Sequence, residues 1–237
     1  MSTGANYPAE RLQKGIGSFS GPAQNTQFNQ IVELIKVAMP LFASSVQQEN
    51  INNENGLNRR LARFITNIAD NHELPYFAQS ESMEDETRGD SPATDFGIHL
   101  KIDDISVDPP KIAIFEGKRL SGDTGTSRRR EYVIGHEKNG KHVPCGGIER
   151  FKCSLHGRNF RHAGIIGYIQ EETPGYWWKQ INSWISELML QQATPMWSCD
   201  EQLLPISTSK QISQSASIVI READKLHLTH LWINLVV

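Results

Sequence analysis

The segment 111–118 constrains this chain more than any other part of it, because it is apolar until it ends in Glu116-Gly117-Lys118. A continuous apolar run of this length is typical of a central strand that is covered on both faces. Residues i and i+2 of a strand project to the same face, so we expect Glu116 and Lys118 to point together. The alternating segment that begins at Asp95 predicts a second strand, and Asp95 would reach the pair if that strand is a neighbour.

Two carboxylates beside an ammonium group favour one kind of chemistry, the hydrolysis of a phosphodiester. Carboxylates and a backbone carbonyl, here that of Gly117, are ligands that suit Mg²⁺. The ion would neutralise the phosphate and activate water, while Lys118 holds the water or contacts the phosphate. The competing interpretation is structural: Glu116 and Lys118 form an ion pair at a strand end, and Asp95 is a capping or turn residue.

Asp95, followed by Glu116-x-Lys118 after an apolar strand, resembles the signature of the PD-(D/E)xK nuclease superfamily. The resemblance covers about residues 54–188 in pattern. It implies a restriction-endonuclease-like core, an α/β arrangement in which helices flank a mixed sheet. It also implies that Asp95 and Glu116 bind Mg²⁺ or Mn²⁺ and that Lys118 assists catalysis. Members often have proline directly before the aspartate, whereas this chain has Thr94 there.

Three further residues are candidates for the same site. Many family members carry a supporting acid on the helix before the core strands, and Glu54 stands where a helix is expected to begin; alternatively, it is an acid favoured there by the helix dipole. Gln170 resembles a glutamine or lysine that some members carry near the site, unless it is only a polar residue at a strand end. His99 shares the expected face of Asp95, although a solvent-facing histidine is the competing interpretation.

A basic segment follows the predicted catalytic strand. Residues 118–162 contain eleven lysines and arginines and four acids, within a chain whose net charge is −3. This asymmetry beside Glu116-x-Lys118 favours contact with a nucleic-acid backbone over a merely solvated face. No pattern predicts base recognition, so DNA or RNA and any sequence preference stay open. The predicted phosphate-binding residues are Arg119, Arg128, Arg129, Arg130, Arg150, Lys152, Arg158 and Arg161.

Composition and periodicity predict the architecture. Residues 1–25 are polar and rich in Gly, Ser, Asn and Pro, which predicts a flexible leader, and 26–237 are expected to form a single domain with its core at about 46–192. The polar, acidic residues 79–93 predict a loop. Helices are expected within 26–43, over 57–68, from 147 and from 174, and strands over 95–102, 111–117, 163–169 and a C-terminal hairpin of 215–221 and 226–235.

The cysteines and the hydropathy pattern exclude some classes of protein. No apolar stretch reaches membrane-spanning length, and no signal-peptide core is present, so we expect a cytoplasmic protein without a membrane partner. Three irregularly spaced cysteines argue against a disulfide framework. A zinc site is also disfavoured, since no Cys-x2-Cys pair exists and the spacing matches no compact finger. The residues that prompt that idea are His136, His142, Cys145, Cys153 and His156.

Together these patterns and the resemblance predict a magnesium-dependent nuclease, with DNA as the favoured polymer. The resemblance further implies a role in restriction or as an anti-phage defence effector. A free nuclease is hazardous to its cell, so we expect control by a regulatory partner protein or by homo-oligomerisation. The alternative is a non-catalytic nucleic-acid-binding or scaffolding subunit of a larger complex that keeps the nuclease fold. An RNA-processing enzyme is a third class, which only a comparison of both polymers would separate.

Overall fold

The computed structural model describes residues 24–84, 87, 91–104, 106–122 and 129–236. A seven-stranded mixed sheet runs through them in the order β1-β2-β3-β6-β9-β8-β7. A separate two-stranded hairpin is formed by β4 (His136–Lys138) and β5 (Lys141–Val143). The strands of the sheet are β1 (Tyr76–Met83), β2 (Ala93–Leu100), β3 (Lys111–Leu120), β6 (His162–Ile169), β7 (Ser207–Ser209), β8 (Ile212–Ile220) and β9 (Lys225–Asn234).

The directions of the strands decide which strand ends lie together. β1, β2 and β3 form an antiparallel meander, and β6 then runs parallel to β3. β9 is parallel to β6, while β8 and β7 complete the sheet in antiparallel fashion. A crossover that contains the β4–β5 hairpin and helix α5 (Gly147–Lys152) joins β3 to β6. The C-terminal ends of β3, β6 and β9 therefore lie at one edge of the sheet.

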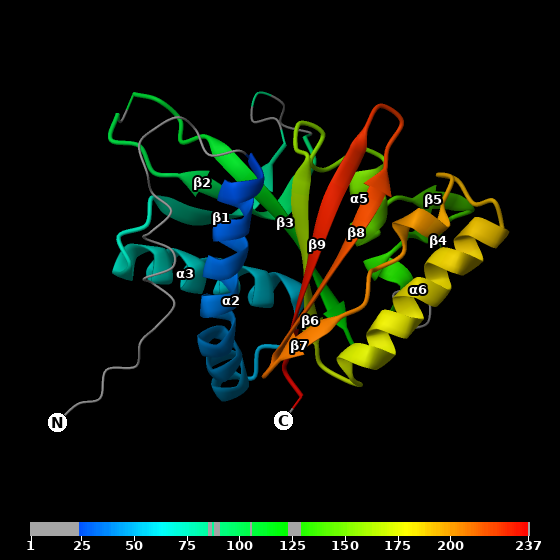
Figure 1. Cartoon of the computed structure of the whole chain (residues 1–237), viewed down its shortest axis with the longest axis horizontal. Coiled ribbons are helices and arrows are strands. Elements are labelled where there is room, and N and C mark those ends of the chain that lie inside the picture. The colour runs from blue at the N-terminus through cyan, green and yellow to red at the C-terminus, as the bar shows by residue number, and fades with distance from the viewer. Residues whose placement is uncertain (1–23, 85–86, 88–90, 105, 123–128, 237) are drawn as a thin grey trace.

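Helices cover both faces of the sheet (Figure 1). The long helices α2 (Gln24–Glu49) and α3 (Glu54–Asn71) lie on one face, and α5 and α6 (Pro174–Leu190) lie on the other. Successive residues of β3 point to opposite faces of the sheet and so contribute to both cores. Phe115 packs in the core under α2 and α3, and Ile114 packs in the core under α5 and α6. The predicted class, an α/β protein with helices on a mixed sheet, is confirmed.

The helix starts follow from capping residues in the sequence. Asn53 precedes α3, and its side-chain oxygen accepts a hydrogen bond of 2.8 Å from the backbone N–H of Gly56. Glu54 is the first residue of α3, where an acid is favoured by the helix dipole. Thr173 caps α6, and Pro174 occupies its first position, as the sequence predicts. The 3₁₀ turns η1 (Arg130–Tyr132) and η2 (Cys199–Glu201) complete the secondary structure used below.

The predicted helices and strands are present with ends shifted by a few residues, but one predicted loop is wrong. Residues 79–83 of the predicted loop 79–93 belong to β1, which pairs with β2 at the edge of the sheet. An edge strand tolerates the polar composition of this segment, because one side of it faces water. The predicted leader 1–25 lies outside the described residues, except for residues 24 and 25 at the start of α2.

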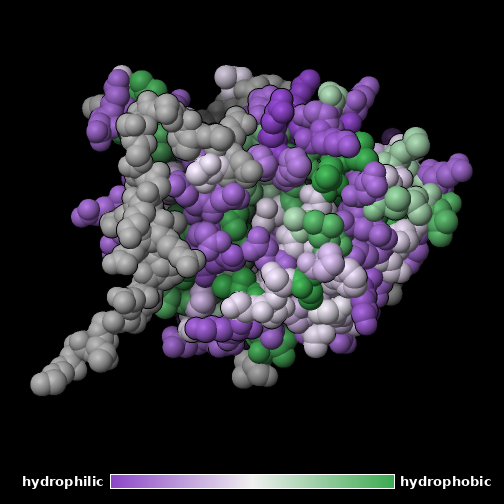
Figure 2. Space-filling view, viewed as in Figure 1, coloured by the Kyte–Doolittle hydropathy of each residue, from purple (hydrophilic) through white to green (hydrophobic). Residues whose placement is uncertain are grey.

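On the face that Figure 2 draws, the hydrophobic residues of the described part of the chain stand in small groups among hydrophilic ones. Some apolar surface of this kind is normal on a water-exposed face. Among the described helices, none has the length and apolar character that crossing a bilayer requires.

Candidate nuclease site

The sheet brings the three signature residues to one place. β2 and β3 pair in antiparallel register with Phe96 opposite Phe115, so Asp95 stands one step further, beside Glu116. Since Phe96 and Phe115 face the core under α2 and α3, the alternation turns Asp95, Glu116 and Lys118 to the other face. The predicted convergence of these three residues is what the register produces.

The side chain of Asp95 takes the place of a backbone hydrogen bond just beyond the end of the pairing between β2 and β3. Its Oδ2 accepts a hydrogen bond of 2.6 Å from the backbone N–H of Gly117. Burial first, and then the negative charges of Glu116 and Glu54, raise the pKa of Asp95 to about 8, although Lys118 and the Gly117 N–H act to lower it. Asp95 is thus a buried carboxyl group beside two other acids, an environment in which a bound divalent cation would stabilise its charged form.

Glu116 is fully buried and surrounded by positive charge. His156 Nδ1 contacts its Oε1, Arg150 Nη1 lies 3.2 Å from its Oε2, and Lys118 Nζ lies 3.8 Å from the same oxygen. Burial by itself would raise the pKa of Glu116, but the hydrogen bond and charge of His156, with Lys118 and Arg150, outweigh it and lower the pKa to about 2. Glu116 is thus an ionised carboxylate at any physiological pH.

Lys118 is the cation that the acids share. Its Nζ lies 3.1 Å from Glu54 Oε1, and its side chain is 8% exposed, whereas that of Glu54 is 33% exposed. Burial would lower the pKa of Lys118, but Glu54, Glu116 and Asp95 outweigh it and raise the pKa. The amine therefore stays protonated, so at this position it is a fixed positive charge and not a base. Solvent reaches the cluster from the side of Glu54.

Glu54 also fixes the end of β3. Its Oε2 accepts a hydrogen bond of 3.3 Å from the backbone N–H of Arg119, while its Oε1 holds Lys118. A helix-start acid that served only the helix dipole would not need to reach a strand. The prediction that Glu54 belongs to this site is thereby supported by its contacts, and its role as a metal ligand stays a prediction.

Gly117 is required by close packing against α3. A Cβ on Gly117 would lie 1.8 Å from Asn58 Oδ1, which itself accepts a hydrogen bond of 2.7 Å from the Tyr168 hydroxyl. The N–H and C=O of one strand residue point to the same neighbouring strand, so the Gly117 carbonyl is directed toward the side of Asp95. This direction fits the predicted use of that carbonyl as a ligand.

Gly117→Ala is expected to lower the free energy of unfolding by about 1–3 kcal/mol, because the added methyl group forces buried Asn58 away from Tyr168. The measurement is urea unfolding followed by circular dichroism. Gly175→Ala is the matched control, since its nearest neighbour is Thr173 Oγ1 at 4.0 Å, and alanine should leave the helix unchanged or more stable by up to about 1 kcal/mol. Equal stability of the two variants would contradict the packing argument.

The accessory candidates divide into one near the site and one away from it. Gln170, one residue past β6, accepts a hydrogen bond of 2.5 Å from Arg119 Nε and so adjoins the residue that Glu54 holds. His99 lies four residues along β2 from Asp95, about 13 Å for an extended strand. It is buried, stacks on Phe77 and has its Nδ1 3.0 Å from the Pro109 carbonyl oxygen. The structure therefore does not bring His99 to the site, and His99 is not solvent-facing either.

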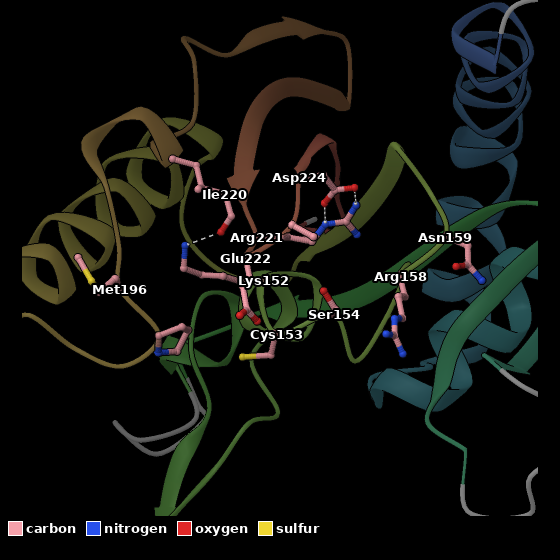
Figure 3. Close-up of a pocket in the computed structure, with 12 residues that line it drawn as sticks. Lys152, Cys153, Ser154, Arg158, Asn159, Met196, Ile220, Arg221, Glu222 and Asp224 are labelled. Atoms are coloured by element: carbon pink, nitrogen blue, oxygen red, sulfur yellow. Dashed lines mark hydrogen bonds and ion pairs between the residues drawn. The ribbon is translucent and has the colours of Figure 1, made fainter.

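The predicted basic surface does not form one continuous region. Because β6 runs parallel to β3 and Lys118 pairs with Gly167, Arg161 before β6 stands at the opposite edge of the sheet, about 20 Å away along the strands. Arg158 precedes it and lines a hollow of about 880 Å³ (Figure 3). These two exposed arginines are therefore far from the catalytic candidates, because a parallel connection returns the chain to the other edge.

Lys152 does not belong with the surface cations. It is buried, and its Nζ lies 2.7 and 2.8 Å from the two carboxylate oxygens of Glu201 and 3.0 Å from the carbonyl oxygen of Ile220, the bond drawn in Figure 3. A buried lysine that is paired with a carboxylate in this way is held inside the fold, since separating the pair is costly, and it is not available to a phosphate. The prediction of a phosphate contact by Lys152 is wrong for this reason.

Two of the remaining arginines adjoin the site. Arg119 follows Lys118, and Arg150 projects from α5 onto Glu116. Arg129 is exposed and donates a hydrogen bond of 3.0 Å from Nε to the carbonyl oxygen of Gly122, two residues past β3. Arg130 pairs with Glu187 on α6 at 3.4 Å. Arg128 lies outside the described residues.

The donor set fits a hard cation at Asp95 better than at Glu116. Asp95, Glu54 and the Gly117 carbonyl offer only oxygen atoms, which suit Mg²⁺, and an ion there would offset both the burial of Asp95 and the acidic neighbours that raise its pKa. Glu116 is already paired with His156 and Arg150, so a metal would share this carboxylate with them. The acids surround the Lys118 ammonium, and a bound ion would draw Asp95 and Glu54 away from it.

Sequence reasoning missed two residues that shape the site. His156 follows α5 and reaches Glu116 only because the crossover folds back over β3, which no local spacing reveals. Asn58 had a usable signal, since it stands four residues after Glu54 and so on the same side of α3. In comparisons with protein families, with curated proteins and with solved structures, no match to this chain is found.

Proposed function

We propose that this chain is a metal-dependent nuclease with a restriction-endonuclease-like core, and that DNA is its substrate. The observation that carries the proposal is the convergence of Asp95 from β2, Glu116 and Lys118 from β3, and Glu54 from α3, with the pKa of Asp95 raised to about 8 by burial and by its acidic neighbours. The meander β1–β2–β3 followed by the parallel strand β6 is the mixed arrangement that the resemblance implies.

Each residue has a role that its contacts support. A Mg²⁺ ion held by Asp95, Gly117 and Glu54 would neutralise the scissile phosphate and activate water. Lys118, kept protonated by the three acids, would stabilise the charge that develops on the phosphate. Glu116 holds Lys118 and Arg150 in place by its own fixed negative charge. The exposed side of the cluster, at Glu54, is where a substrate would enter.

We further propose that Arg119 and Arg129 contact the nucleic-acid backbone beside the site. Arg119 is the next-to-last residue of β3, and Arg129, in the segment that follows β3, is exposed. Arg158 and Arg161 would contact a more distant part of the backbone, because they stand at the other edge of the sheet. A regulatory partner or self-association would restrain the activity, since unrestrained cleavage would harm the cell.

The test offers the purified full-length chain double-stranded DNA, single-stranded DNA and RNA of one sequence in separate reactions with Mg²⁺. Cleavage of DNA that EDTA stops and Mg²⁺ restores is the expected result, read from end-labelled products on denaturing gels. Cleavage of RNA alone would replace DNA with RNA in the proposal. Absence of cleavage on every polymer, with and without self-association at high protein concentration, would contradict the enzyme.

The alternative is a non-catalytic nucleic-acid-binding subunit, and one observation favours it. The carboxylate of Glu116 is fully buried and already paired with His156 and Arg150, as in an ionic network that only stabilises a fold. This function predicts that the chain binds nucleic acid without cleaving it and that Lys118→Met leaves binding unchanged. Measured DNA affinity by fluorescence anisotropy, run beside the cleavage assay, separates the two functions.

A further inference from the structure

We infer that Glu131, His136 and Cys145 form a zinc site, separate from the proposed magnesium site, that clips the crossover between β3 and β6 together. Among the described residues, these three offer a carboxylate oxygen, an imidazole nitrogen and a thiol sulfur whose atoms all lie within 4.8 Å of one another. They come from η1, from the first residue of β4 and from the link between β5 and α5. Their spacing in the sequence matches no compact zinc motif, and only the fold brings the three residues together.

The distances match the edges of a zinc coordination polyhedron. His136 Nδ1 lies 3.2 Å from Glu131 Oε1 and 3.3 Å from Cys145 Sγ. Ligands about 2.0–2.3 Å from a tetrahedral Zn²⁺ are separated from one another by roughly 3.3–3.7 Å. Small adjustments of side chains that are only half-buried would therefore admit the ion, and water would complete the fourth position.

The same geometry disfavours a nucleophilic Cys-His-Glu triad. Such a triad uses both ring nitrogens, one toward the nucleophile and the other toward the acid. Here Cys145 and Glu131 both approach a single nitrogen, His136 Nδ1. One imidazole nitrogen cannot serve both partners as a proton relay, whereas three ligand atoms around one point are what a metal ion requires.

The mixed donor set selects zinc over magnesium. Thiolate and imidazole are ligands of borderline-soft metals, whereas Mg²⁺ takes oxygen ligands. The two proposed sites therefore differ in the metal that they bind. Zinc binding can be measured without nucleic acid, so its outcome does not depend on whether the chain is a nuclease.

The backbone around the three residues is held in place by Glu149 of α5. This fully buried carboxylate accepts a hydrogen bond of 2.8 Å from the N–H of Gly135, directly before His136, and one of 3.4 Å from the N–H of Gly146, directly after Cys145. The two segments approach so closely that a Cβ on Gly146 would lie 2.4 Å from the Cα of Ile134. Ligands on such a braced frame are pre-organised for a metal.

A zinc ion there would also steady the proposed nuclease site. The link that carries Cys145 leads directly into α5, whose Arg150 pairs with Glu116 and whose Gly147 lies against the stem of Lys118. Fixing η1, β4 and the start of α5 to one ion would limit the movement of both cations. The proposed zinc site is thus a structural site next to the proposed nuclease site.

The test uses the full-length chain freed of metal by a chelator and then given Co²⁺ or Zn²⁺ alone. We expect one zinc per chain by elemental analysis. We also expect the cobalt form to show a near-ultraviolet thiolate-to-cobalt absorption that Zn²⁺ abolishes. Cys145→Ser should remove this absorption, and His136→Ala should weaken zinc binding at least about tenfold. Cys153→Ser and Cys199→Ser, which change exposed thiols, are the matched controls and should keep both signals.

The result is decisive even if Cys145→Ser fails to fold. Glu131→Gln keeps the size and the thiol, and it should still weaken zinc binding about tenfold while far-ultraviolet circular dichroism stays unchanged. Zinc should raise the melting temperature of the wild type and not that of Glu131→Gln. A wild type that retains no zinc, or a cobalt absorption that survives Cys145→Ser, would overturn the inference.

Discussion

Glu116→Gln is expected to reduce cleavage by at least about 100-fold, the cost of removing one well-placed charged group from an active site. The substitution keeps the shape of the side chain and removes the charge that holds Lys118, Arg150 and His156. Without that charge, the Lys118 and Arg150 side chains repel each other, and Lys118 is no longer directed toward the substrate. Initial rates at saturating Mg²⁺, for wild type and variant, give the measurement.

The same substitution is expected to lower stability, and this effect has to be separated from catalysis. Removing one partner of a buried ion pair costs about 3–5 kcal/mol, because the remaining charges stay buried. Glu201→Gln is the matched control: Glu201 is also fully buried and paired with a lysine, Lys152, but lies outside the site. We expect it to lose comparable stability, by urea unfolding, while each folded molecule keeps its full cleavage rate.

Comparison of these two variants decides what the buried network does. If both variants lose rate only in proportion to the folded fraction, Glu116 is structural and the non-catalytic subunit becomes the better function. If Glu116→Gln alone is inactive when folded, the network serves catalysis. Lys118→Met should then match Glu116→Gln in rate, since groups that act as a unit lose activity together.

The part of the site that lies within one local pattern could be predicted from the sequence. The apolar segment before Glu116 fixed its strand, and alternation fixed the face of Asp95, so the convergence followed once the two strands were neighbours. The helix that begins near Glu54 was predictable from the spacing of its apolar residues, whereas the place of Glu54 in the site was expected only from the family resemblance. The inferences drawn from the residues themselves need only the period of one element.

The parts that depend on the path of the crossover could not be predicted. Arg161 and Arg119 share one basic segment, but the parallel pairing of β3 with β6 sends them to opposite edges of the sheet. His156 and the cluster around His136 come together through the same crossover, and their spacing matches no known local motif. The number of charges along a segment does not reveal where its residues lie in the fold, because a connection as long as the one between β3 and β6 can follow many paths.

Magnesium affinity is expected to rise about tenfold per pH unit between about pH 6 and pH 7.5, and to level off above about pH 8. Burial, with Glu116 and Glu54, raises the pKa of Asp95 to about 8, so the ion must displace a proton from Asp95 at lower pH. Isothermal titration calorimetry in two buffers of different ionisation enthalpy measures that proton directly. Release should approach one proton per ion near pH 6 and disappear well above pH 8.

The free energy of unfolding of the chain without magnesium should also depend on pH, through the same carboxyl group. In the unfolded chain Asp95 titrates near its model value of 3.8, whereas in the folded chain its pKa is about 8. Between these values the folded state holds the extra proton, so the free energy of unfolding decreases as pH rises from about 4 to about 8. Magnesium should reverse this decrease at pH 8, because it replaces the lost proton as the partner of the carboxylate.

Asp95→Asn separates this carboxylate from all other titrating groups. The variant should lose the pH dependence of stability that belongs to Asp95, bind magnesium at least about tenfold more weakly and release no proton on binding. Asp104→Asn, which changes an exposed aspartate hydrogen-bonded to Ser106, is the matched control and should behave as wild type. A magnesium affinity that is the same at pH 6 and pH 8 in the wild type would mean that Asp95 does not hold the ion. The role of Asp95 would then be structural only: its carboxylate accepts the hydrogen bond of the Gly117 N–H at the end of the β2–β3 pairing.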